Sequence, residues 1–290
     1  MNESNNNQKK YAGLILLQSL VYGFGNPLTK VAYESTTPFI LLAIRFTLAF
    51  FIFMLFFGKR IITHIKEIKF REFFMPSICM ALAYISCNVA LSLTSATNVG
   101  FMMSLSVIIA PILSVPILKR KYNKRQLPIQ LLVLIGVFLL HYNGEKININ
   151  NGDIISLFMA MFLAASLVYG EKSVRKSDPI VVSSMQSGMT AILSIVCVLV
   201  FDDFTVVSNV EPSAWMVIIY LAIFCTCLAY FFQNKALVKL KSSTVAMLQC
   251  TQPILTAGAS FLILGETMGV SAFIGGIIIL SCILLQIRSK

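Results

Sequence analysis

The chain has 290 residues, of which 57% are hydrophobic and only 12% are charged, and its mean hydropathy is +0.83. A soluble domain carries about 25% charged residues, so this composition excludes a soluble globular protein and predicts an all-α polytopic membrane protein. The net charge of +11 has two explanations, a nucleic-acid-binding surface or basic loops on one side of a membrane.

Ten apolar runs are long enough to cross a bilayer, because about 20 residues of helix span about 30 Å of hydrocarbon. The first run has no small-residue cleavage site and continues past Asn26 and Pro27, so we expect a retained span rather than a secretory signal. The longest connection, residues 58–72, is basic and is expected to lie partly on the membrane surface. The predicted transmembrane helices cover residues 12–32, 38–57, 73–93, 98–118, 127–142, 154–172, 179–201, 214–234, 243–264 and 268–287.

The positive charges alternate with these spans. If the N-terminus is cytoplasmic, 20 of the 23 lysine and arginine residues fall in cytoplasmic segments, Lys30 and Lys146 fall on the outer side, and Arg45 lies within a span. This is a strong positive-inside pattern. It predicts a multi-pass protein of the cell (inner) membrane with both termini in the cytoplasm, and it accounts for the net charge without nucleic acid.

The second half of the chain repeats the first. We divide the sequence into residues 1–146 and 147–290, two repeats of five spans each. Because five is an odd number, the second repeat enters the membrane from the opposite side, an inverted architecture common in secondary transporters. The aligned pairs are Tyr84 with Tyr230 and Asn88 with Asn234 at a shift of 146 residues, and Arg45 with Gln186 at a shift of 141.

Two segments carry small residues, prolines and charges in a distinctive order. They are VYGFGNPLTKVAYESTTPFILLAIRFTLAFF, which contains Arg45, and ALVKLKSSTVAMLQCTQPILTAGASFLILGE, which contains Pro253 and ends at Glu266. They resemble the EamA-type members of the drug/metabolite transporter superfamily, and the resemblance covers nearly the whole chain. It implies ten helices and transport of metabolites or drugs, often export of amino acids or related solutes. The first repeat departs from the pattern, with Val107 in place of Pro253 and Arg120 in place of Glu266, which predicts that the helix break is shifted between the halves.

Polar side chains inside membrane spans are costly and usually face the bundle interior or a water-filled cavity. In the first, third and eighth spans a tyrosine precedes an asparagine by four residues, so both lie on one helix face. In the ninth span two glutamines precede a proline. These patterns predict contacts with a small polar solute, and the alternatives are hydrogen bonds between helices or repair of a kinked backbone. The predicted substrate-binding residues are Tyr22, Asn26, Arg45, Tyr84, Asn88, Tyr230, Asn234, Gln249 and Gln252.

Arg45 lies about 10 Å below the outer surface, judged by the helix rise from Pro38. A charge at that depth needs a partner or water. Three alternatives are open for it: attraction of a substrate carboxylate, a pair with Glu266, or snorkelling to the interface. No carboxylate or histidine lies near a span centre, which predicts facilitated transport or coupling through a peripheral group such as Glu171 or Glu266.

Nothing in the sequence indicates an enzyme, a cofactor or a metal site. It has no phosphate-binding glycine loop and no histidine cluster. Its seven cysteines are an odd number, lie in apolar runs and are expected to pack rather than to form disulfides. Small residues on the tenth span, among them Ser271 and Gly275, predict close helix packing within the chain or a homodimer interface.

These observations predict a secondary or facilitative transporter of small polar metabolites that works by alternating access. Its expected partners are a small-molecule substrate and the lipid bilayer. A structural or regulatory membrane protein and an intramembrane enzyme are the alternatives. The mirrored polar pairs favour the transporter, because helices that only support a membrane assembly have no need of polar groups at matching depths.

Overall fold

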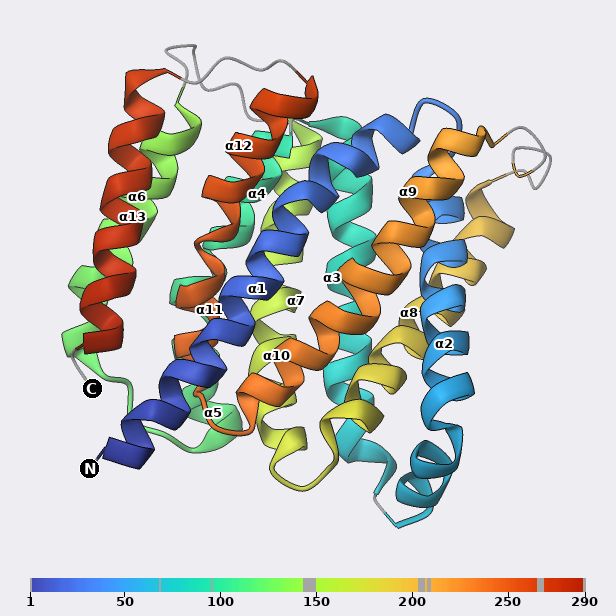
Figure 1. Ribbon diagram of the computed structural model, residues 1–290, viewed down its shortest axis with the longest axis horizontal. Helices are drawn as coiled ribbons and strands as arrows, with labels where there is room; N and C mark the ends of the chain where they lie inside the picture. The colour runs from blue at the N-terminus through green and yellow to red at the C-terminus, as the bar shows by residue number, and fades with distance from the viewer. Residues whose placement is uncertain are drawn as a thin grey trace.

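The computed structural model describes residues 2–67, 69–94, 96–142, 150–202, 207, 210–264 and 269–288, and within them every regular element is a helix (Figure 1). The first half contains α1 (Asn2–Ala32), α2 (Pro38–Glu67), α3 (Phe70–Leu93), α4 (Ala96–Ser104), α5 (Ser106–Leu118), the short 3-10 helix η1 (Lys124–Gln126) and α6 (Leu127–His141). The second half contains α7 (Asn151–Val174), α8 (Pro179–Phe201), α9 (Pro212–Ala222), the π-helix η3 (Ile223–Leu228), α10 (Ala229–Leu237), α11 (Ser242–Gln249), α12 (Gln252–Leu264) and α13 (Val270–Arg288).

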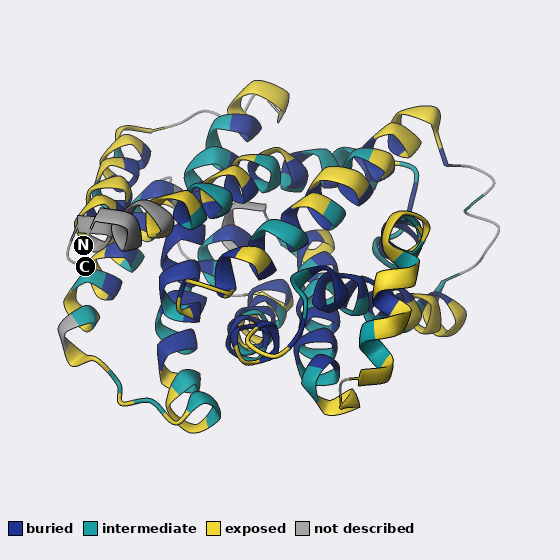
Figure 2. Ribbon diagram, turned by 60° about the horizontal axis from the view of Figure 1, so that its bottom comes forward, coloured by how far each residue is buried: buried dark blue, intermediate teal, exposed yellow. Residues whose placement is uncertain are grey.

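The ten predicted spans correspond to ten helical segments, three of which contain an interruption. Among the described residues, seven segments are long and apolar enough to cross a membrane, and α6 and α13 are shorter apolar helices. Large apolar side chains such as Phe56 and Leu262 are more than 70% exposed, and exposed positions cover the outside of the bundle (Figure 2). Ordinary soluble proteins bury such side chains, so this surface fits a lipid environment.

The second helix is longer than its apolar run. We expected it to end at residue 57, but α2 continues to Glu67 and leaves only a short connection before α3 begins at Phe70. The extension is held by packing, because Ile61 is fully buried beside Ile180 and Val181, and by an ion pair between Arg60 and Asp178. The basic connection is therefore mostly helix rather than loop.

The two halves run in opposite directions through the bundle. At one end, Lys30 near the end of α1 donates to the Thr94 carbonyl oxygen at the end of α3, and the Thr94 hydroxyl donates to Asp153 in the first turn of α7. Thus α1 ends where α7, the first helix of the second half, begins. The predicted inversion is confirmed, while the predicted boundary between residues 146 and 147 lies in residues 143–149, outside the described residues.

The packing of the helices follows a twofold relation between the halves. Helix α3 packs on α7, and its counterpart, the α9–η3–α10 segment, packs on α1. Likewise α4 and α5 pack on α7, while α11 and α12 pack on α1. Two pairs cross the symmetry axis directly, α2 with α8 and α6 with α13. The cavity described below lies between the halves that this arrangement brings together.

The fourth and ninth spans are broken at equivalent positions. The first break separates Ser104 from Ser106 and the second separates Gln249 from Gln252, so both centre on residues that align at the shift of 146. The prediction of a shifted break is wrong. The first repeat breaks without a proline at the break. The Ser104 hydroxyl donates there to the Gly100 carbonyl oxygen at 3.0 Å, a type of bond that favours bending of a helix. In the second repeat Pro253 lacks the amide donor that would continue the helix.

Glycines bring α6 and α13 into contact. A Cβ built on Gly136 would lie 3.0 Å from the Gly275 carbonyl oxygen, and one built on Gly275 would collide with the backbone of α6. Gly275 belongs to the small-residue face predicted on the tenth span, so that face is occupied by a helix of the same chain at this position. Small residues allow such close helix approach in membranes.

We expect Gly275→Ala to destabilise the protein by about 1–3 kcal/mol, because the added methyl group overpacks a backbone contact. The matched control is Gly258→Ala, since a Cβ at Gly258 meets nothing within 4 Å and alanine in a helix costs less than glycine. Thermal unfolding of the purified protein in detergent measures both. A transition temperature for Gly275→Ala that equals or exceeds that of Gly258→Ala would contradict the close contact.

Candidate functional site

A cavity lies where the two halves meet, and every interrupted span contributes to its wall. The space open to the centres of water-sized molecules is about 70 Å³, several times what one water needs. Its polar and sulfur-bearing lining consists of Tyr22, Asn26, Thr29, Arg45, Met80, Tyr84, Cys87, Asn88, Met103, Ser104, Ser106, Met159, Cys225, Gln233, Gln249, Cys250 and Gln252. The remaining lining residues are Gly25, Ala83, Leu91, Leu163, Leu221 and Ala246.

The first span reaches the cavity through its GFGNP segment. Helix α1 continues through Pro27, which cannot donate to the preceding turn. Further along the same helix, the Thr29 hydroxyl donates to the Gly25 carbonyl oxygen at 2.8 Å. A Cβ built on Gly23 would lie 2.6 Å from the Leu255 Cβ atom, so the glycine lets α1 approach α12. This turn therefore places Tyr22 and Asn26 at the cavity wall.

Three buried glutamines, Gln18, Gln233 and Gln249, form a cluster at one side of the cavity. The Gln233 side-chain oxygen accepts from the Gln18 amide at 3.0 Å and from the Gln249 amide at 2.9 Å. This arrangement leaves the Gln233 amide nitrogen and the Gln249 amide oxygen without a partner among the described residues. Buried polar atoms are nearly always paired in proteins, and these two unpaired atoms belong to residues that line the cavity.

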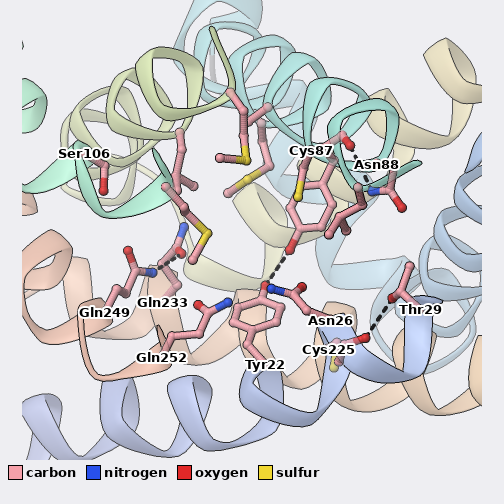
Figure 3. Close-up of a pocket in the computed structure, with 18 of the residues that line it drawn as sticks. Tyr22, Asn26, Thr29, Cys87, Asn88, Ser106, Cys225, Gln233, Gln249 and Gln252 are labelled. Atoms are coloured by element: carbon pink, nitrogen blue, oxygen red, sulfur yellow. Dashed lines mark hydrogen bonds between the residues drawn. The ribbon is translucent and has the colours of Figure 1, made fainter. Parts of the chain in front are cut away.

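Gln252 joins this cluster from the start of α12. Figure 3 shows Gln233, Gln249 and Gln252 on the same side of the cavity, with Tyr22 and Asn26 beside them. Across the described structure no hydrogen bond engages the side-chain amide of Gln252 or of Asn26. The helix break before Gln252 thus presents an uncommitted donor and acceptor to the cavity, as broken helices of transporters commonly do near their substrate.

Tyrosine side chains form the middle of the cavity. The Tyr84 hydroxyl donates to the Tyr22 hydroxyl at 2.8 Å. The Tyr84 ring stands edge-on to the rings of Phe46 and Tyr230, with centroids 5.0 and 5.8 Å away. These contacts fix the Tyr84 ring while its hydroxyl stays at the cavity wall.

Arg45 lines the same cavity and is only 4% exposed. Its Nε atom donates to the Thr226 hydroxyl at 2.8 Å, and its Nη2 atom donates to the Cys225 carbonyl oxygen at 3.0 Å. Both partners lie in the π-helix η3. Short π-helical segments occur frequently at functional sites, and this one provides the two acceptors that hold the guanidinium group. Glu266, the partner that the sequence left open, lies outside the described residues.

Of the nine sequence-predicted site residues, the structure brings seven to the cavity wall: Tyr22, Asn26, Arg45, Tyr84, Asn88, Gln249 and Gln252. Asn88 is otherwise engaged, because its side-chain oxygen accepts from Tyr33 at 2.7 Å and its amide donates to the Tyr84 carbonyl oxygen.

Tyr230 and Asn234 lie outside the lining. Tyr230 is fully buried behind the ring of Tyr84, and the Asn234 amide donates to the Ser183 hydroxyl and to the Gln186 side-chain oxygen.

Sequence reasoning missed Gln233, Ser104, Ser106 and Thr226. Gln233 precedes Asn234 in the same span, and a polar side chain at the span interior was the signal available for it. No local sequence feature distinguishes Gln233 from Asn234. Consecutive side chains point about 100° apart around a helix, so the packing of α10 decides which of the two reaches the cavity. The two serines flank a helix break that the sequence placed elsewhere.

A buried carboxylate joins the helices at the end of the bundle that holds both termini. Glu171 on α7 is 1% exposed and pairs with Arg120 at 2.6 Å and with Arg175 at 2.8 Å. Its other oxygen accepts from the Ser242 backbone amide, the first residue of α11, at 2.8 Å. Arg120 follows α5 of the first half, whereas Glu171 and Ser242 belong to the second. We call these three residues and Arg175 the Glu171 lock.

Comparison with known proteins identifies a family for this chain and a solved structure with the same fold. Residues 9–142 and 150–288 each match the EamA-like transporter family. An uncharacterized transporter of Archaeoglobus fulgidus is 29% identical over 281 residues, covering 96% of this chain and 86% of that protein. The uncharacterized transporter YwfM of Bacillus subtilis is 22% identical over 275 residues, covering 91% and 89%. A solved crystal structure of a protein matches with a TM-score of 0.78 at 16% identity, covering 95% of this chain and 96% of that one, which shows a shared fold.

Proposed function

This chain belongs to the EamA-like transporter family, and we propose that it moves a small polar metabolite through the central cavity by alternating access. The family is one of membrane transporters, which favours transport over the intramembrane-enzyme alternative. The observation that carries the proposal is a group of incompletely paired amides on residues of the cavity wall. Gln233 and Gln249 each keep one side-chain atom without a partner, and the Gln252 side chain makes no hydrogen bond in the described structure. Buried donors and acceptors without partners are costly, and a polar solute that pairs with them recovers that cost.

Two features support the proposal that the solute path is closed between the cavity and the end of the bundle that holds both termini. The described cavity lining extends from the glutamine cluster toward Thr29 and Asn88, near the opposite ends of α1 and α3. The Glu171 lock lies beyond the glutamines, between the cavity and the terminal end. By the positive-inside pattern we assign the terminal end to the cytoplasm. The described state is then sealed toward the cytoplasm, and opening the lock would expose the cavity to that side.

The coupling mechanism follows from the charges at the cavity. Among its described lining residues there is no carboxylate and no histidine, the groups that membrane proton relays generally use. We propose facilitated transport, and the alternative is coupling through a peripheral carboxylate such as Glu171 or Glu266. On the family resemblance, amino acids and related metabolites, among them carboxylic acids, form the first screening panel, and we propose outward movement.

Counterflow in proteoliposomes tests the function. We expect accumulation of a labelled small polar metabolite against an excess of the same unlabelled compound inside. Gln252→Ala should lower the rate at least about tenfold, since the loss of one or two hydrogen bonds to a desolvated solute costs about 1.5–3 kcal/mol. The control is Gln130→Ala. Gln130 is a buried glutamine that lies outside the cavity, and its side-chain oxygen accepts a hydrogen bond from the Tyr122 hydroxyl.

Three results would count against the proposal. They are the absence of counterflow for every metabolite class with correctly folded protein, an equal loss in both glutamine variants, or full activity in Gln252→Ala.

A further inference from the structure

We propose that Arg45 anchors a carboxylate and that the transported solutes are small organic monoanions. This inference rests on the proposed transport function and names its substrate class. Arg45 is a buried cation at the wall of the cavity, and the described structure gives it no anionic partner. Four ion pairs occur between described residues, and none includes Arg45. A buried charge without a counter-charge is strongly unfavourable, so the site is incomplete until an anion enters.

The guanidinium group of Arg45 is held in place by two hydrogen bonds, but not all of its N–H donors have a partner in the described structure. Its Nε and Nη2 atoms each make one hydrogen bond, to Thr226 and to Cys225, and its Nη1 atom makes none in the described structure. The Thr226 hydroxyl itself donates to the Leu221 carbonyl oxygen at 3.0 Å, which directs its remaining acceptor capacity toward Arg45. Arginine carries five N–H donors in a rigid fork, so several donors stay free for a carboxylate.

Aromatic rings hold the plane of the guanidinium group. Its Cζ atom lies 5.0 Å from the Phe46 ring centroid and 5.2 Å from that of Tyr84, within the range of cation–π attraction. The Tyr84 and Tyr22 hydroxyls share one hydrogen bond, which leaves one hydroxyl proton of the pair for a further acceptor. The free donors of Arg45 and of the tyrosine pair therefore suit an anionic oxygen group. The ring faces of Phe46 and Tyr84 are already in contact with Arg45.

The charge is not required by the packing of this region. Gln186, which aligns with Arg45 in the second half, fills the equivalent position with a neutral amide and accepts a hydrogen bond from Asn234. The second repeat therefore folds with a neutral side chain at the position that aligns with Arg45. The positive charge of Arg45 is therefore present in one half only, and the structure places it at the cavity wall.

A monoanion fits the charge of the site better than a zwitterion or a cation. The described lining contains one cation and no carboxylate, so a monoanion leaves the occupied site neutral. A zwitterion leaves it with one net positive charge and brings a desolvated ammonium group without a carboxylate to pair with. A cation adds like charge at close range, which destabilises both groups.

The test uses two series of matched probes that differ in charge. The first contains lactate, lactamide, alanine and 1-amino-2-propanol, and the second contains the phenyl-substituted analogues of these four compounds. Proteoliposomes with the full-length protein are assayed for counterflow of each probe. We expect uptake of the carboxylate of at least one series, and rates at least about tenfold lower for its amide, zwitterionic and cationic counterparts.

Three variants separate recognition from folding. Arg45→Gln should lower carboxylate transport about 10- to 100-fold, the loss expected for a charge-assisted hydrogen bond, and should reduce the preference for carboxylate over amide. Arg45→Lys keeps the charge and should retain that preference at a reduced rate. Arg60→Gln removes an exposed arginine at the terminal end and should behave as the parent. A purely structural Arg45 would lower transport of every probe by the same factor.

The outcomes distinguish two failures. Preference for an amide, zwitterionic or cationic probe, or a carboxylate preference that survives Arg45→Gln, overturns the assignment of Arg45 and leaves transport intact. Absence of counterflow for every probe and every metabolite class overturns the proposed function and this inference with it.

Discussion

In the Glu171→Gln variant, amide hydrogen exchange in the segment 242–249 should rise at least about tenfold. The substitution keeps the shape of the side chain but removes the charge that holds Arg120, Arg175 and the first amide of α11. A hydrogen bond to a charged group contributes about 1.5–3 kcal/mol. Arg175 is half exposed, so solvent screens its share, and the expected effect depends mainly on Arg120 and Ser242.

Hydrogen exchange followed by mass spectrometry measures this opening directly, and Glu72→Gln is its control. Glu72 pairs with Lys176 at the same end of the bundle, but the lysine side chain is 60% exposed, and exposed pairs contribute little. We expect unchanged exchange in the control. The role of the Glu171 lock would be contradicted by either of two results. The first is unaltered protection of residues 242–249 in Glu171→Gln, and the second is an equal fall in protection in both variants.

A second large effect is expected at Asn234, whose position should become accessible only when the cytoplasmic side opens. Asn234 is fully buried in the described state, whereas Asn88, its repeat counterpart, lines the cavity. Alternating access in an inverted repeat exchanges the conformations of the two halves. In the opposite state the second half should therefore line the cavity with the counterparts of the residues that line it now.

Unpaired polar atoms mark the region that should open. The Tyr230 hydroxyl, the Asn234 side-chain oxygen and the Gln186 amide nitrogen are buried without partners among the described residues. Such atoms are rare in native structures and call for an explanation. Water or solute that reaches them in the opposite state would satisfy all three. The sequence prediction that Tyr230 and Asn234 bind substrate is thus retained as a proposal for that state.

Cysteine accessibility tests this exchange. In a chain whose seven native cysteines are replaced, the Asn234→Cys variant should resist a membrane-impermeant maleimide, and adding Glu171→Gln should raise its alkylation rate at least about tenfold. Val182→Cys is the buried control, because its repeat counterpart, Leu41, lies outside the cavity. Slow alkylation of the Asn234→Cys variant in both backgrounds, or equal gains at positions 182 and 234, would contradict the exchange.

Much of the fold was accessible from local features of the sequence. Apolar run lengths located all ten spans, and their ends moved where packing continued a helix past its apolar part, as at Ile61 on α2. The 146-residue shift that aligns Tyr84 with Tyr230 indicated the repeat, and the odd number of spans indicated its inversion. The position of the first helix break was missed, because Val107 stands where the second repeat has Pro253 and no proline marks the break.

The candidate site was only partly accessible. Polar residues inside apolar spans are visible in any sequence, and seven of the nine chosen line the cavity. The sequence could not separate Gln233 from Asn234, because their exposure depends on how α10 is rotated against α1 and α8. It also treated Glu171 as a peripheral group, although the structure buries it between Arg120 and the start of α11.

The sequence by itself determined the membrane location, the number of spans, the inverted repeat and the uneven distribution of positive charge. These properties depend on composition, run length and order along the chain, which no tertiary contact alters. Only the tertiary structure decided which of the aligned polar residues reach the cavity, which amides remain unpaired and that the Arg45 side chain lacks an anionic partner among the described residues. Those properties depend on contacts between helices that are separate in the sequence, and they differ between repeats whose sequences align.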